Sequence, residues 1–322
     1  MDHSTELTQS AAARHRRGRF AAVLFLVGAP LMLVLASMLS GRRWYMLFAL
    51  LMVTAALAPF FISFEKRRPR AREVVLIATM SALTVASHLF FGLLMPVQVG
   101  TAMVVISGVS LGSEAGVLVG SLSRLVINMY VGQGLWTLWQ MFCWALLGFL
   151  AGLVFSRGGL LESKMPGEEL PKERRLSEGV RVMMAPVMTI LFAEIAGYIS
   201  YVLFPGSDTT FFSWRVYAFG AAGLLAAPIL IRGKLPVNGV TLSVFTFVTT
   251  FVLYGGIMNL SSKLISSASG FDMGSQSLTA LYISGVPYDL LHAGSAAVCA
   301  AILGRSIISK LERIKVKYGI YK

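Results

Sequence analysis

Long apolar stretches alternate with short basic segments along this chain. Several stretches reach the roughly 20 residues that an α-helix needs to cross a bilayer. They lack the sustained two-residue alternation of membrane β-strands, so the pattern predicts an all-α, polytopic transmembrane helical bundle of about ten spans. The clearest expected spans are 20–40, 44–64, 72–94, 114–131, 135–156, 178–204, 214–231, 237–260 and 286–309.

Two prolines modify this pattern. Pro96 opens a short apolar segment at 97–111, and Pro287 is expected to break the helix that starts near residue 277, leaving a short half-helix before the last span. The expected organisation is a basic N-terminus (1–19), an accessory transmembrane hairpin (20–64), core helices (71–156), a cytoplasmic loop (157–177), a C-terminal transmembrane half (178–309) and a basic tail (310–322).

The composition agrees with a membrane protein. Hydrophobic residues make up 56% of the 322 positions and charged residues 13%, and the mean hydropathy is +0.73. The net charge of +13 is concentrated in alternate inter-span segments, which is the positive-inside pattern and predicts that both termini are cytoplasmic. Because the charge follows the topology, we expect the lipid bilayer and no nucleic acid as a partner.

Three ridges of small residues run along predicted helices at four-residue spacing, where another helix can approach closely. Each ridge either packs inside the bundle or forms a docking face for a separate membrane subunit, and spacing alone does not decide. The ridges are Ala78, Ala82 and Ala86; Gly112, Gly116 and Gly120; and Gly148 and Gly152.

A few ionisable and polar residues lie inside predicted spans, where each is costly and therefore a functional candidate. Arg124 is a candidate for a structural ion pair with Glu194 or Asp289, and direct contact with a ligand is the alternative. His88, alone on an apolar helix, is interpreted as a packing residue. The other candidates for substrate contact in this group are Asn128, Glu194, Tyr198, Tyr288, Asp289 and His292.

Catalytic, metal-binding and nucleotide-binding motifs are absent from the sequence. There is no GxxxxGK[ST] segment for ATP, no nucleophile elbow and no metal-ligand spacing among four histidines and two cysteines. We therefore expect no enzyme activity, no cofactor and no bound metal. Energy for any transport would come from a gradient or from partner subunits.

The stretch 71–156 resembles the S components of energy-coupling factor (ECF) vitamin transporters. The resemblance is carried by "REVVLIATMSALTVA", "PVQVGTAMVVISGVSLGSEAGVLVGSLSRLVINMYVGQG" and "WTLWQMFCWALLGFLAGLVF", and more loosely by "GVPYDLLHAG" and "KLERIKVKYG". It implies a longer variant with extra helices, located as a multi-pass protein in the bacterial cytoplasmic membrane.

The resemblance also implies partners and a ligand. Ala78, Ala82 and Ala86 stand where that family docks on its transmembrane coupling subunit, which works with two cytoplasmic ATPase subunits. The ligand implied is a small vitamin or related micronutrient taken up from outside, and a loose likeness to longer members favours cobalamin or a corrinoid precursor. An autonomous permease driven by ions or protons is the alternative.

The decapeptide GQGLWTLWQM, residues 132–141, is expected at the outer ends of two core spans. Glycines on both sides of Gln133 permit a tight turn that presents its amide inward. Trp136, Trp139 and Gln140 are expected on one helix face, forming a flat, polar-edged wall for a planar ligand. For Trp136 alone, an interfacial aromatic belt is the competing interpretation.

Overall fold

The computed structural model describes residues 69–93, 97–155, 231–269 and 277–320, together with scattered positions between 51 and 66 and between 192 and 229. The predicted N-terminal segment 1–19, the loop 157–177 and most of the predicted spans in 20–64 and 178–231 lie outside these residues.

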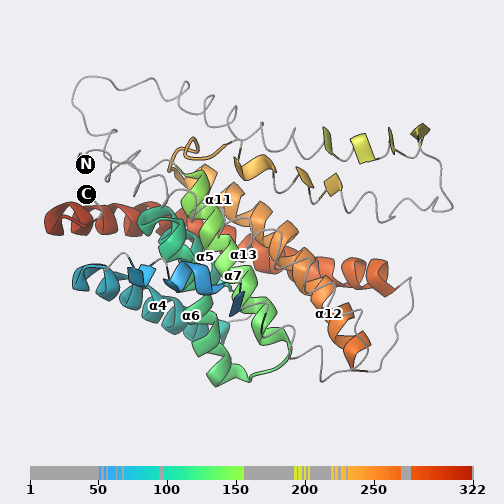
Figure 1. Cartoon of the computed structure of the whole chain (residues 1–322), viewed down its shortest axis with the longest axis horizontal. Helices are drawn as coiled ribbons and strands as arrows, with labels where there is room; N and C mark the ends of the chain where they lie inside the picture. Colours follow the sequence, from blue (N-terminus) through green and yellow to red (C-terminus); the bar gives the residue numbers. More distant parts are fainter. Residues whose placement is uncertain are drawn as a thin grey trace, which may run out of the picture.

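The described residues form helices, as predicted (Figure 1). In this part of the chain the other regular feature is one isolated bridge between Phe155 and Leu235. The helices are α4 (Ala71–Gly92), α5 (Val99–Leu111), α6 (Ser113–Val131), α7 (Trp136–Val154), α11 (Gly239–Val248), the π-helical η2 (Thr249–Gly255), α12 (Gly256–Ala268) and α13 (Ser277–Tyr318).

Four helical segments among the described residues are long and apolar enough to cross a membrane. They are Ala71–Gly92, Trp136–Val154, Gly239–Ser266 and Ala280–Tyr318, and Val99–Leu111 is a shorter apolar helix. The total of about ten spans and the cytoplasmic placement of both termini stay predictions.

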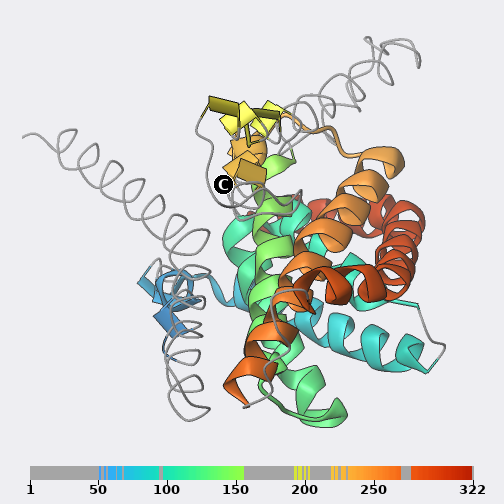
Figure 2. The ribbon, with the colours of Figure 1, turned by 90° about the vertical axis from the view of Figure 1, so that its right-hand side faces the viewer.

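Helix α5 forms the centre of the bundle. Every one of its 13 residues is buried, as expected for a helix that is apolar on all sides. It packs against α4, α6, α7 and α13. Helix α7, light green in both views, passes through the middle of the described helices beside it (Figures 1 and 2).

Glycines form the contact between α5, α6 and α7. A Cβ atom added at Gly108 or Gly116 would overlap the backbone carbonyl of Gly148. Gly120 and Gly152 lie equally close to backbone atoms of the facing helix. The two glycine ridges predicted from the sequence therefore pack inside the bundle, because only glycine allows these backbones to approach so closely.

The connections between the core helices are short. A single residue, Gly112, separates α5 from α6 with φ of 94°, in the left-handed region that glycine adopts without strain. Pro287 lies inside α13 and does not end it, contrary to the expected break. Contacts hold α13 on both sides of the proline, because Tyr282 Oη donates to the backbone oxygen of Gly256 before it and His292 lies against Thr101 after it.

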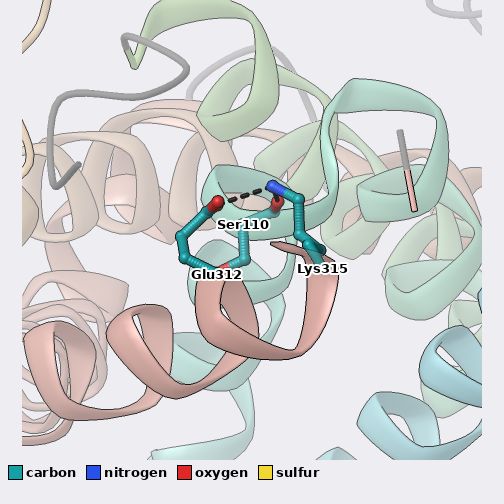
Figure 3. Close-up of polar contacts among 3 residues, drawn as sticks. All are labelled: Ser110, Glu312 and Lys315. Carbon is teal, nitrogen blue, oxygen red and sulfur yellow. Dashed lines mark hydrogen bonds and ion pairs between the residues drawn. The ribbon is translucent and has the colours of Figure 1, made fainter. Parts of the chain in front are cut away.

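Basic residues connect the C-terminal end of α13 to the last turn of α5 and to the residue before α4. Lys315 donates from Nζ to the backbone oxygen of Ser110 at 2.7 Å and to Glu312 Oε1 at 2.6 Å (Figure 3). Arg70 Nη1 donates to the backbone oxygen of Gly319 at 2.7 Å. A cation at the last carbonyls of α5 stabilises that helix end.

Candidate ligand-binding site

The turn between α6 and α7 lies at the lower edge of the ribbon in Figure 1, at the end of α6 away from Gly112. Gly132 ends α6 with φ of 114°, as the paired glycines predicted. Thr137 Oγ1 accepts hydrogen bonds from the backbone N–H of Gly134 and from Asn128 Nδ2, each at 3.1 Å. These bonds fix the register of the two helices just beyond the turn.

One helical turn further into the bundle, α6 and α7 are joined by polar side chains. Arg124 donates from Nε and Nη2 to Gln140 Oε1, at 2.9 and 2.8 Å. Asn128 Nδ2 donates to the same oxygen at 2.9 Å. Three donors on one amide oxygen hold Gln140 in a single orientation, with its Nε2 turned away from the guanidinium.

Helix α4 adds His88 to this group, which sequence reasoning had set aside as a packing residue. Arg124 Nη1 lies 3.3 Å from His88 Nε2. The indole of Trp144 contacts both, with its ring 5.2 Å from the imidazole and 5.2 Å from the guanidinium carbon. We call His88, Arg124, Asn128, Gln140 and Trp144 the Arg124 cluster.

Arg124 has no ion-pair partner among the described residues, which corrects the expected pairing with Asp289. The Asp289 carboxylate instead accepts a hydrogen bond from Asn259 Nδ2 at 2.9 Å. Gly255 and Gly285 leave the room for this pair, because a Cβ at either would press on Asp289 or Asn259. Glu194, the other expected partner, lies outside the described residues.

A second polar group surrounds His292 on α13. Thr101 Oγ1 lies 2.9 Å from His292 Nε2, and the ring of Tyr254 lies 4.7 Å from the imidazole in an edge-on arrangement. Tyr288 also contacts His292, at 6.1 Å between ring centres, although its side chain is 53% exposed.

The two groups adjoin through the start of α5. A Cβ added at Gly100 would lie 2.8 Å from His88 Cβ and 3.0 Å from Trp144 Cη2. The next residue, Thr101, contacts His292. The structure therefore brings together the predicted residues Arg124, Asn128 and Gln140, and places His292 next to this group, against the following residue of α5.

Other predicted residues lie elsewhere. Gln133 is exposed and donates to the backbone oxygen of Leu125 at 3.4 Å, so it covers the end of α6 instead of pointing inward. Trp139 is 2% exposed and belongs to the hydrophobic core, whereas Trp136 is 46% exposed and lies over Gly134. Tyr198 lies outside the described residues.

Comparison with known proteins adds the family. Residues 69–166 match the family model described as ECF-type riboflavin transporter, S component. This part of the chain is therefore similar to an ECF S component. No curated protein and no solved structure matches the chain. S components are substrate-specific membrane subunits of transporters and not enzymes. The described residues also hold no group of three or more side chains suited to a metal ion.

The alanine ridge on α4 differs from the two glycine ridges. Ala78, Ala82 and Ala86 are all exposed on α4, whereas the opposite face of the helix, which carries Met80 and Thr84, is buried. A smooth strip of small side chains is thus available along the outside of the helix.

Proposed function

We propose that the whole chain works as the substrate-binding membrane subunit of an ECF-type importer for a vitamin or related micronutrient. The observation that carries the proposal is the family match over residues 69–166, which covers α4 to α7 and thus both the Arg124 cluster and the alanine ridge. In this scheme the ligand binds toward the α6–α7 end of the core. The coupling subunit docks on α4, and separate cytoplasmic subunits hydrolyse ATP.

The ligand is proposed only as a class. The description of the matched family names riboflavin, so riboflavin is the first ligand to test for binding. The corrinoid expected from the sequence is the second. The guanidinium and amide groups of the Arg124 cluster support a ligand with polar edges, because they bring several hydrogen-bond donors together between α6 and α7.

Docking on α4 is proposed from the exposure of its alanines. Ala82→Leu adds a branched side chain in the middle of the exposed strip, so we expect it to block close approach of the coupling subunit. Transport should be lost while ligand affinity and thermal stability stay at the wild-type level. Leu83→Ala, on an adjacent exposed position, is the matched control and should transport normally.

The decisive experiment is co-purification from native membranes. Tagged chain should bring down a transmembrane coupling subunit and ATPase subunits, and uptake in vesicles should require ATP. Repeated purification without these subunits, together with uptake that proceeds without nucleotide and stops with a protonophore, would refute the proposal. That outcome would favour the ion- or proton-coupled permease. The first residues to test for ion or proton binding would then be the pair Asp289 and Asn259 and the neighbouring His292.

A further inference from the structure

The Arg124 cluster contains many hydrogen-bond donors and a positive charge, but no carboxylate among the described residues. A guanidinium has five N–H groups. Three of them are engaged, two by Gln140 Oε1 and one by His88 Nε2, which leaves two without a partner in the described part of the chain. A part-buried cation on a helix of a membrane bundle is costly unless an anion or several acceptors meet it.

Two neighbouring side chains add further donors. Because Arg124 must donate to His88 Nε2, the imidazole proton lies on Nδ1, and this buried atom has no hydrogen-bond partner. The indole Nε1 of Trp144 is likewise buried without a partner. Neither of these donors is directed at the guanidinium, because His88 Nδ1 faces Gly100 of α5 and the Trp144 ring presents its face, and not its N–H edge, to Arg124. Among the described residues, the two free N–H groups of Arg124 itself, on a part-buried cation, are therefore the feature that needs an explanation.

The amide of Gln140 supplies no free acceptor to the rest of the Arg124 guanidinium. Its oxygen is occupied by Arg124 and Asn128, so the group it can still offer is the NH₂ donor. The acceptor nearest to the guanidinium is thus already used within the protein. The remaining N–H groups of the cluster have no acceptor, and the cluster carries a net positive charge with no counter-charge among the described residues.

We propose that this cluster binds an oxyanion, a carboxylate or a phosphate, on the transported ligand. This rests on the proposed function and narrows its substrate class: the ligand is an anionic micronutrient whose acidic group lies at Arg124. A guanidinium is well suited to such a group, because two parallel N–H donors match two oxygens of a carboxylate or phosphate.

The test compares matched probe pairs on the purified full chain. Titration calorimetry would use riboflavin against flavin mononucleotide, which share a ring and differ by a phosphate, and nicotinamide against nicotinate, which differ by a carboxylate. Native mass spectrometry would identify any molecule that co-purifies. We expect the anionic member of one pair to bind at least about tenfold tighter, and the pair that responds tells phosphate from carboxylate.

Substitutions assign the preference to the cluster. Arg124→Gln should remove it, Arg124→Lys should keep part of it, and Arg72→Gln, an exposed arginine at the other end of α4, should leave it unchanged. Gln140→Glu is the sharpest variant, because it keeps the acceptor for Arg124 and adds the missing counter-charge. The variant should keep or raise the unfolding temperature of the protein, but it should no longer bind the anionic probe.

Several results would overturn the proposal. One is a neutral co-purified molecule, or equal affinity for both members of each pair, including no binding in either. Another is an Arg124→Gln variant that keeps the preference. A third is that Glu194→Gln and Arg124→Gln lower the stability of the protein equally and that the wild-type protein shows no preference for the anionic probe. That result would identify an internal ion pair. In each case co-purified coupling subunits would leave the proposed function standing, so the two failures are distinguishable.

Discussion

The close contact between Gly116 and Gly148 makes a quantitative prediction for the core. An alanine at Gly148 would place its Cβ against the backbone of Gly116, including its carbonyl oxygen, and backbone atoms cannot rotate aside as a long side chain can. Helices α6 and α7 would have to separate. Overpacking of this kind costs about 1–3 kcal/mol, against which alanine gains about 1 kcal/mol of helix propensity over glycine.

Gly294 supplies the matched control. It lies inside α13, and a Cβ added there meets no other atom within 4 Å, so Gly294→Ala keeps the propensity gain without the overlap. The two variants should therefore differ by about 1–3 kcal/mol in the free energy of unfolding, with Gly148→Ala the less stable. Gly116→Ala should behave like Gly148→Ala, because it meets the same contact from the other side.

The assay is reversible unfolding of the purified protein in mixed detergent micelles, followed by tryptophan fluorescence. Trp144 reports directly, since its backbone lies against Gly120 in the same glycine contact. Gel filtration at the start of each titration would show that the variants are monodisperse. Equal unfolding free energies for Gly148→Ala and Gly294→Ala would refute the argument that glycine is needed for close approach at this position.

Three further predictions concern single positions. Gly132→Ala, at a φ of 114°, should lower the unfolding free energy by about 1–2 kcal/mol in the same assay. Trp139→Ala should cost roughly 3–5 kcal/mol because its side chain is buried, whereas the half-exposed Trp136→Ala should cost far less, a comparison that separates core from surface. Lys315→Met should speed hydrogen exchange in the last turns of α13 by removing its bonds to α5 and Glu312, and unchanged exchange would show that these bonds do not hold the tail.

The helices of residues 71–156 could be predicted from the sequence because local residues determine where they begin and end. Gly112 and Gly132 occupy positive φ at two of the helix ends, and apolar residues fill the lengths between them. Pro287 misled the prediction, since proline removes one backbone hydrogen bond but packing on both sides keeps α13 continuous. Local rules therefore failed where contacts distant in sequence decided the outcome.

The site could be predicted less completely. Four-residue spacing correctly put Arg124 and Asn128 together, and Gln140 joined them from the next helix. His88 gave no such signal, because its partner lies 36 positions away and a single histidine on an apolar helix has no spacing to read. The signal available was weak: His88 continues the inward row of Met80 and Thr84 at four-residue steps.

Helix α4 connects the two proposed activities of the domain. Its inward row ends at His88 in the Arg124 cluster, and its outward row is the exposed alanine strip, rotated to the opposite side. A ligand that contacts the cluster therefore acts on the same rigid helix that the coupling subunit is proposed to grip. A ligand shifts a conformational equilibrium only as far as it binds the two conformations with different affinity. Any effect of the ligand on docking should therefore depend more on His88, which lies on α4, than on Thr101 and His292, which lie on α5 and α13.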